Sequence, residues 1–313
     1  MAGRIYSTIA LATLCCFGLA QTPLEILTRS YESRKTTPAS LLVVQSAFGE
    51  PTKVVTKVEM DGHGKVRRTV MQPLRLQGLT SVDDGRTWQV QVPDQKVLLS
   101  MPSPQTRAMT VKVRVELINK NYRVSEDKSI KIAGRDTITL VCRAKSRGIP
   151  TRRLYLDEKT TLPLRTEYQN GSQFEVLLDT LSVEFPRSLP RELFQLELPE
   201  GYKRVVNSGS PKFETVSDAE KSLGFEPFQP AKMPYGFIVE AVEVVTIGRQ
   251  KVLSVRLSDG LAVATLYQWS ASSRAPSFGA MEVQTGERQG VGYAVVSEPP
   301  EVIGTRIFEA IRR

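Results

Sequence analysis

The stretch from residue 132 to residue 185 constrains the fold most, because it reads as a run of short strands separated by turns. Its strand-like segments are rich in β-branched and aromatic residues, and they cover Thr137–Cys142, Arg152–Leu156, Leu164–Tyr168 and Phe174–Val183. The last two flank Asn170-Gly171, the strongest short signal for a hairpin turn. Consecutive strands joined by tight turns predict an antiparallel meander, which can leave one face in water while the other covers apolar side chains.

Another meander precedes it, between residues 40 and 101. The strands expected there are Leu41–Ser46, Lys53–Met60, Lys65–Met71, Leu76–Val82, Thr87–Val92 and Val97–Met101. Apolar and polar residues alternate within several of them, as in Trp88–Val92, which is the period of a half-buried strand. The two meanders together predict a mostly antiparallel β structure.

Two further segments carry a helical pattern. Pro23–Lys35 has apolar residues at helical spacing and predicts a short amphipathic helix. Residues 104–119 fit two patterns at once: Val111–Leu117 alternates as a strand would, while Met109, Val113 and Leu117 also satisfy helical spacing. Periodicity alone leaves both structures open for that segment.

A boundary between two domains is predicted near residue 210, because residues 186–218 are rich in proline, glycine and serine. The organisation expected is a signal peptide over 1–20, an N-terminal domain over 21–205, a linker over 206–215 and a C-terminal domain over 216–313. The second domain is expected to be a small α+β unit with helices at Val216–Leu223 and Val302–Arg312 and strands at Ile238–Thr246, Lys251–Ser258, Leu261–Trp269, Gly279–Thr285 and Gly292–Ser297. Asp259-Gly260 marks a hairpin within it.

The first twenty residues predict export. A short segment carrying Arg4 precedes an apolar run that ends in small residues near Ala20, as in a cleaved secretory signal peptide. A membrane anchor is the alternative, but the run is shorter than the ~20 apolar residues of a spanning helix. A lipid anchor at Cys15 or Cys16 is a further alternative, disfavoured because neither cysteine follows the small residue expected for lipid attachment. Cleavage leaves Cys142 alone, which predicts a protein without internal disulfides and a cysteine buried as a small apolar residue.

The chain is basic, with 42 Lys and Arg against 33 Asp and Glu and a formal net charge of +9. A basic exported protein suits anionic partners such as acidic polypeptides, lipid headgroups or lipopolysaccharide, and nucleic acid is not expected outside the cytoplasm. The basic residues are scattered along the strands instead of forming one stripe. The charge therefore narrows the choice of partner only slightly.

Catalytic and cofactor motifs are missing from the sequence. His63 is the only histidine and sits in a glycine-flanked turn, so a Ser-His-Asp or Cys-His arrangement lacks its base. Neither a phosphate-binding loop nor a Cys/His metal spacing occurs. The carboxylate pairs Asp83-Asp84 and Asp157-Glu158 both occupy turn signals, where Asp bonds the local backbone. We expect a binding protein with no cofactor, not an enzyme.

Several of these segments resemble a known family. Ala133-Gly134-Arg135, Arg153–Asp157 and Leu162–Arg165 are similar to the LolA/LolB-like fold, and more specifically to the MucB/RseB family of periplasmic regulators. Met233–Phe237 and Ser258–Leu261 resemble the opening and the hairpin of that family's C-terminal domain. The usual Tyr-x-Gly-Thr start of the family is not found near residue 42.

The resemblance implies a fold and a function. It implies a mostly antiparallel α+β fold, with a half-open β-barrel wrapped around helices and followed by a smaller α+β domain, and it favours a helix over residues 104–119. It also implies an exported regulator that binds the periplasmic segment of a membrane anti-sigma factor and senses a lipid or mislocalised lipoprotein in an apolar barrel. A LolA-like carrier of lipoproteins or lipids is the alternative.

Two sets of residues are the candidates for these contacts. The candidates for an apolar lining that accepts an acyl lipid, lipopolysaccharide or lipoprotein are Trp88, Val90, Leu98, Leu154, Leu156 and Leu164. The candidates for contact with the protein partner are Ser258, Asp259, Gly260 and Leu261.

Overall fold

The computed structural model describes residues 21–46, 52–229, 233–278, 283–297 and 302–312. The predicted signal peptide over residues 1–20 and most of the predicted strand Gly279–Thr285 lie outside these residues. Within the described residues no helix has the length and apolar character needed to cross a membrane.

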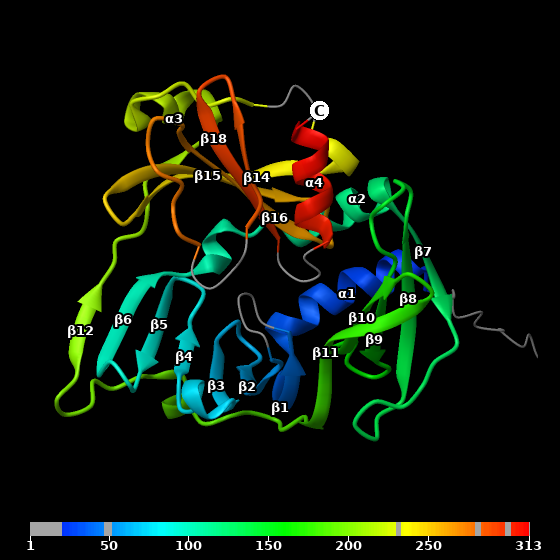
Figure 1. Ribbon diagram of the computed structural model, residues 1–313. Coiled ribbons are helices and arrows are strands. Elements are labelled where there is room, and N and C mark those ends of the chain that lie inside the picture. The colour runs from blue at the N-terminus through cyan, green and yellow to red at the C-terminus, as the bar shows by residue number, and fades with distance from the viewer. Residues whose placement is uncertain (1–20, 47–51, 230–232, 279–282, 298–301, 313) are drawn as a thin grey trace, which may run out of the picture.

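The first sheet contains twelve strands in the order β12-β6-β5-β4-β3-β2-β1-β11-β10-β9-β8-β7 (Figure 1). All neighbours pair antiparallel except β12 and β6, which are parallel. The sheet does not close, because β7 and β12 are its two ends. Its strands are β1 (Pro38–Gln45), β2 (Val54–Asp61), β3 (Val66–Gln72), β4 (Thr80–Asp83), β5 (Thr87–Val92), β6 (Val97–Pro102), β7 (Tyr122–Asp127), β8 (Thr137–Ala144), β9 (Arg152–Asp157), β10 (Pro163–Asn170), β11 (Gln173–Glu184) and β12 (Lys203–Val206).

Two helices pack against this sheet. α1 (Pro23–Thr36) starts with a capping box, in which Thr22 accepts from the N–H of Glu25 and Glu25 accepts from the N–H of Thr22. α2 (Val111–Asn121) is capped by Thr110, which accepts from the N–H of Val113. α2 packs on α1 and on β7 (Figure 1). The helix expected over residues 104–119 is therefore confirmed, although it begins at Val111, after the 3₁₀ turn η2 (Pro104–Arg107).

The second sheet contains six antiparallel strands in the order β13-β14-β15-β16-β18-β17. Helix α3 (Val216–Leu223) packs on β14 and β15, and helix α4 (Val302–Arg312) packs on β18 and β16. The strands are β13 (Lys212–Phe213), β14 (Ile238–Ile247), β15 (Gln250–Ser258), β16 (Val263–Ser270), β17 (Thr285–Arg288) and β18 (Val291–Ser297).

The largest hydrophobic core joins the two sheets. One cluster of buried side chains contains Leu27 of α1, Ile118 of α2 and Leu140 of β8 together with Leu253 of β15 and Ile303 of α4. The predicted fold class, an antiparallel half-open barrel around helices followed by a smaller α+β unit, is confirmed. The predicted domain limits stay a prediction. The first sheet ends at Val206 and the second begins at Lys212, but one hydrophobic core extends through both sheets.

Candidate functional site

Strand register defines one face of the first sheet. Val58 of β2 lies opposite Arg68 of β3, and the row continues through Ser81 of β4 and Val90 of β5 to Leu99 of β6. Directly paired residues point to the same side of a sheet. The register also leads from Val54, on the same face of β2 as Val58, across β1, β11 and β10 to Leu154 of β9, which packs with Leu27 of α1, so the helix lies on this side. We call it the inner face.

An adjacent row lies on the same inner face. It runs from Met60 through Val66 and Asp83 to Trp88 and Met101. These two rows place four apolar side chains of β5 and β6 on the inner face, next to the pair Val92 and Val97 at the hairpin end, and we call the four the apolar strip: Trp88, Val90, Leu99 and Met101.

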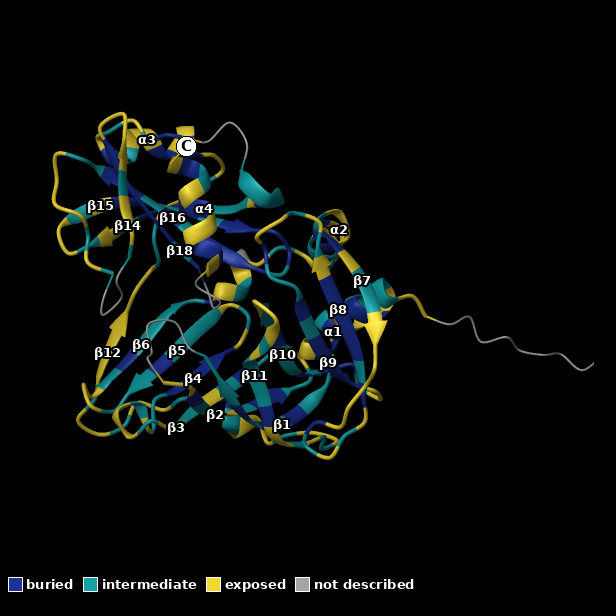
Figure 2. Ribbon diagram, turned by 45° about the vertical axis from the view of Figure 1, so that its right-hand side comes forward, coloured by how far each residue is buried: buried dark blue, intermediate teal, exposed yellow. Residues whose placement is uncertain are grey.

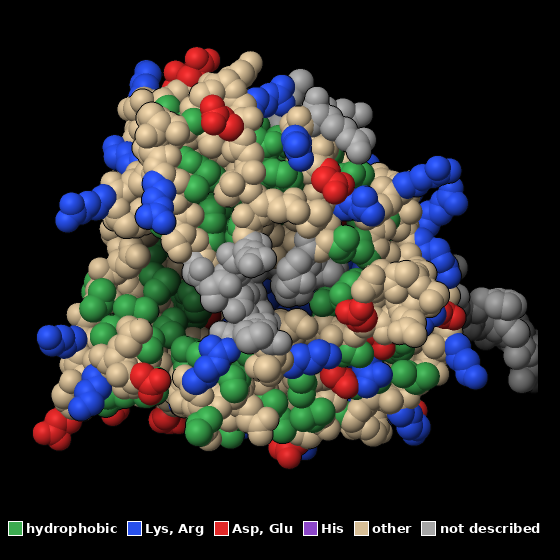
Figure 3. Space-filling view, viewed as in Figure 1, with side chains coloured by type: hydrophobic (Ala, Val, Ile, Leu, Met, Phe, Trp, Pro, Cys, Tyr) green, Lys and Arg blue, Asp and Glu red, His purple; other side chains and the backbone are tan. Residues whose placement is uncertain are grey.

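The helices close one half of this face and leave the other half accessible. Over β7–β9, Leu140 and Leu156 are fully buried against Leu27 and Ile118. Within the apolar strip only Val90 is buried, whereas the other three side chains are half-exposed. β8 is accordingly coloured mostly buried and β5 and β6 mostly intermediate in Figure 2. Figure 3 shows hydrophobic side chains in a hollow between β5–β6 and the second sheet.

The outer face of the same strands is covered by the chain itself. The segment after β11 carries the 3₁₀ turn η3 (Arg191–Phe194), where the Leu193 carbonyl accepts from Arg67 Nη1 at 2.9 Å. Arg67 shares its face with Val82, which is 3% exposed, and with Leu98, which is fully buried. Phe194 is also buried. Since the outer face is covered, the accessible apolar surface of this half lies on the inner face.

The structure separates the six side chains predicted to line a ligand site. Trp88 and Val90 lie side by side on the apolar strip, and Leu98 lies on the outer face of β6. Leu154 and Leu156 belong to the core shared with α1 and α2. Leu164 packs in a second cluster with Ala39 and Leu41. Whether any of the six contacts a ligand stays a prediction.

Sequence reasoning missed Leu99 and Met101. The missing signal was the register of the β5–β6 hairpin, in which Val92 pairs with Val97. That register places the odd-numbered residues of β6 beside Trp88 and Val90, and a shift of one residue exchanges the two faces of a strand.

The turn predicted to contact a protein partner packs against α2. Ser258 and Asp259 are buried, and Tyr122 donates its hydroxyl to Asp259 Oδ2 at 2.6 Å. Burial, together with this carboxylate, raises the pKa of Tyr122 above its usual value. A Cβ added to Gly260 would lie 2.7 Å from Ile118, so α2 approaches the turn too closely for a larger residue. Leu261 packs at the edge of the shared core. A role of Ser258–Leu261 in partner binding stays a prediction.

A buried carboxylate ties the start of α2 to the second sheet. Glu240 of β14 accepts from the N–H of Met109 at 3.1 Å and lies 3.8 Å from Arg114 and 3.0 Å from Arg256. Arg114 also donates to the Gly260 carbonyl at 3.2 Å. α2 is therefore fixed to the second sheet at both ends, with Glu240 at one and Asp259 at the other.

The carboxylates and the cysteine considered for catalysis have structural roles, in turns and in the core. Asp84 Oδ1 accepts from the N–H of Arg86 and of Thr87, and Asp157 Oδ1 accepts from that of Thr160, so both carboxylates support turns. Cys142 is fully buried, and burial raises the pKa of its thiol to about 12. Across the described part of the chain, no cluster of three His, Cys, Asp or Glu could hold a metal ion.

Comparison with solved structures identifies the fold. A crystal structure of MucB is 15% identical in sequence, with a TM-score of 0.57, and the match covers 90% of this chain and 94% of that one. The MucA/MucB complex from Pseudomonas aeruginosa is 16% identical, with a TM-score of 0.61 and coverage of 91% and 96%. MucB in complex with MucA(peri) is 15% identical, with a TM-score of 0.59 and coverage of 91% and 97%.

These matches confirm the resemblance at the level of the fold, since they span both sheets. No model of a known protein family matches the sequence. No curated protein matches it either.

Proposed function

We propose that this chain is an exported regulatory binding protein that binds the exported segment of a membrane anti-sigma factor. The observation that carries the proposal is the likeness of both sheets, over 91% of the chain, to MucB as it stands in complexes with MucA. The sequence resemblance to the MucB/RseB family points to the same class of partner. The signal-like N-terminus would place the protein in the compartment where such a segment is exposed.

The apolar strip supports the second part of the proposal, that an amphiphile controls this binding. Trp88, Leu99 and Met101 present accessible apolar surface on the inner face. Each methylene buried there would contribute about 0.8 kcal/mol, so a long acyl chain would bind without many polar contacts. A ligand in the hollow would lie between the first sheet and the second (Figure 3), where it could alter how the two sheets hold a partner.

A carrier of lipoproteins or lipids on the same scaffold is the second candidate, and the hollow alone would serve it equally well. The shared core counts against it, because a carrier needs only the barrel while here Leu140 and Leu253 belong to one cluster. Transfer of lipidated cargo between membranes by the full chain, with no affinity for any anti-sigma segment, would favour the carrier.

The direct test is the affinity of the purified protein for exported segments of membrane anti-sigma factors from its own organism. Fluorescence anisotropy with labelled segments should find one that binds, and a saturating amphiphile should weaken that binding at least about tenfold, which corresponds to 1.4 kcal/mol. Absence of binding to every such segment would refute the regulatory function.

A pair of variants tests the amphiphile's part. Leu99→Glu places a charge on the apolar strip and should abolish the effect of the amphiphile while preserving affinity for the segment. Leu74→Glu is the matched control, because Leu74 is 84% exposed outside the strip. Equal sensitivity of both variants to the amphiphile would place its site elsewhere.

A further inference from the structure

Strand β12 ends the first sheet and has a neighbouring strand, β6, on one side only (Figure 1). The N–H of Lys203 donates to the Lys96 carbonyl, at the start of β6, at 2.9 Å. Because the backbone groups of successive residues in a strand face alternate sides, Lys203 and Val205 face β6, whereas the N–H and C=O groups of Arg204 and Val206 face away from it. Among the described residues, none of the backbone hydrogen bonds involves these outward groups. β12 therefore presents a free edge.

Apolar side chains lie on both faces of this free edge. The register pairs Val205 with Leu99, which places Val205 on the inner face, and Val206 with Ser100, which places Val206 on the outer face. The exposed fractions of Val205 and Val206 are 44% and 72%. Both valines therefore keep apolar surface that a further strand would cover.

The strand at the other end of the sheet, β7, has a free edge of another kind. It ends in Glu126 and Asp127, which are exposed, and Arg123 is exposed near its start. Charged side chains on an edge strand discourage other chains from pairing with it. β12 has charged residues only in its first half and valines in its second half, so its edge is the less protected of the two.

The first half of β12 is cationic. Lys203 and Arg204 are exposed, and among the described residues neither takes part in an ion pair. A carboxylate on a strand beside them would be attracted by both charges, and apolar side chains further along that strand would lie next to the valines. The edge is thus complementary to a segment that is acidic at one end and apolar beyond it.

We propose that the free edge of β12 binds an extended polypeptide segment by strand addition, with acidic residues of the segment beside Lys203 and Arg204 and apolar residues beside Val205 and Val206. In this mode the outward backbone groups of β12 supply affinity, and its side chains supply the preference for one kind of sequence. The proposal goes beyond the proposed function, because it requires neither the apolar strip nor an anti-sigma segment.

A second copy of the chain is the competing occupant of this edge. Two β12 strands paired antiparallel about Val205 would bring Lys203 and Arg204 of one copy close to the same residues of the other. Like charges on neighbouring strands repel, and each copy carries a formal net charge of +9. The charges therefore favour an acidic segment over a second copy.

A selection experiment on the purified protein tests the proposal before the natural partner is identified. Random peptides long enough to span β12 are displayed on phage and enriched by binding to the protein. The enriched sequences should place Asp or Glu at one end of a stretch in which apolar residues alternate with others. Absence of any enriched peptide, or enrichment of peptides without acidic residues, would overturn the proposal.

Val206→Pro tests the backbone part of the interaction. Proline removes the outward N–H of residue 206 but leaves the N–H groups that β12 directs to β6 in place. The affinity of the enriched peptides, measured by fluorescence anisotropy, should fall at least about tenfold. Unchanged affinity in this variant would overturn the proposal, and thermal unfolding checks that the variant keeps its fold.

Glu126→Pro is the matched control on β7. The N–H of Lys145 donates to the Asn121 carbonyl, so the odd-numbered residues of β7 face β8 and the N–H of Glu126 faces outward, as that of Val206 does. This variant should bind the enriched peptides as the unaltered protein does. A loss equal to that of Val206→Pro would show that the peptides do not distinguish the two edges and would overturn the assignment to β12.

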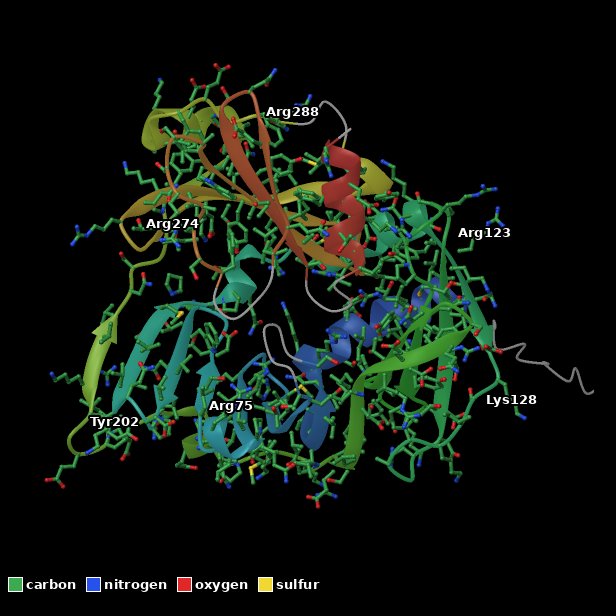
Figure 4. The ribbon with its side chains drawn as sticks, viewed as in Figure 1. Arg75, Arg123, Lys128, Tyr202, Arg274 and Arg288 are labelled. Atoms are coloured by element: carbon green, nitrogen blue, oxygen red, sulfur yellow. The ribbon has the colours of Figure 1, made fainter. Side chains whose placement is uncertain are left out.

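A second pair of variants tests the charges. Lys203→Gln combined with Arg204→Gln should weaken the enriched peptides about three- to tenfold at low salt, and the loss should shrink as the salt concentration rises. The control removes Arg123 and Lys128, which lie beside β7 and point away from the molecule, at the opposite end of the sheet from Tyr202 and β12 (Figure 4). An equal loss in Arg123→Gln with Lys128→Gln would reduce the effect to net charge and overturn the proposal.

Two other outcomes would also overturn it. A dimer seen by light scattering, which Val206→Pro converts to a monomer, would make a second copy the occupant of the edge. Enriched peptides that monooleoylglycerol displaces and that still bind Val206→Pro would lie on the apolar strip instead of the edge.

Discussion

The two halves of the first sheet differ in what covers the same face. Over β7–β9 the helices α1 and α2 bury Leu140, Cys142 and Leu156 completely, and this core continues into the second sheet. Over β5 and β6, Trp88, Leu99 and Met101 keep part of their surface accessible, with Arg68 nearby on the same face. The half over β7–β9 is thus packed core that stabilises the fold, while the half over β5 and β6 retains apolar surface that a ligand can cover.

This difference shows that the alternation of apolar and polar residues along a barrel strand does not indicate whether its inner face is packed core or a binding surface. Leu156 and Leu99 are both leucines on inner faces of antiparallel strands, yet only Leu156 has helices packed over it. A hydrophobic inner face becomes core or binding surface according to what lies on it.

The largest expected effect is on thiol reactivity. In protein lacking residues 1–20, Cys142 is the only cysteine, and burial raises its pKa. We expect a thiol reagent at pH 8 to modify it about a thousandfold more slowly than in the unfolded chain, because modification requires opening of the core. In the Cys142→Ala background, Leu99→Cys should react with the same reagent at a rate close to that of the unfolded chain. Similar rates at the two positions would remove the distinction between the halves.

Next in size is the loss of stability from truncating matched leucines. Leu156→Ala should reduce the free energy of unfolding by about 2–5 kcal/mol, because it opens a cavity in the closed half. Leu99→Ala should cost about 1 kcal/mol or less, since its side chain is only half-buried. Urea denaturation followed by circular dichroism compares them, and equal losses would mean that both halves are packed core.

A smaller loss is expected at the joint between α2 and the second sheet. Tyr122→Phe deprives the buried Asp259 carboxylate of a 2.6 Å hydrogen bond and should cost about 1–3 kcal/mol. Tyr168→Phe removes a bond of the same length to Glu175 on an exposed surface, and should cost about 0.5 kcal/mol or less. Thermal unfolding of both variants measures the difference. A small loss of stability in Tyr122→Phe would show that the joint contributes little.

The smallest effect concerns acid stability of the closed half. Burial of Asp157 opposes ionisation, but hydrogen bonds from Arg135 and Thr160 overcome it and lower the pKa. A depressed pKa gives stability that is present above the unfolded value of about 4 and lost as the pH falls through the folded value. Unfolding free energy should therefore decline less between pH 5 and pH 3 in Asp157→Asn than in the unaltered protein.

Arg135→Gln provides a second variant for the same test, since it removes the guanidinium that donates to Asp157 Oδ2 at 2.7 Å. It should flatten the acid decline in the same direction. Parallel pH profiles for all three proteins would rule out Asp157 as a source of acid sensitivity.

Much of the fold was predictable because its strands are punctuated by strong turns. Asn170-Gly171 and Asp259-Gly260 both join strands as expected. β7 was missed, because Tyr122 both ends α2 and begins the strand, so no turn residue separates them. β12 was missed because it is only four residues long and follows a segment rich in proline and glycine.

The candidate site was predictable only in part. The alternation of β5 identified Trp88 and Val90, but the face of β6 depended on the hairpin register, so Leu98 was chosen in place of Leu99. The contact of Arg114 with the ring of Tyr31 joins two helices that lie far apart in the sequence, and no local pattern encodes such a meeting.

The most direct test of the central claim is native mass spectrometry of the protein after expression with export, looking for a co-purifying amphiphile. The account predicts an adduct with the mass of an acyl-chain ligand, which detergent displaces and which Leu99→Glu abolishes. A clean mass of the protein alone, with no uptake of added amphiphile, would contradict it and make the hollow over β5 and β6 a surface without an acyl ligand.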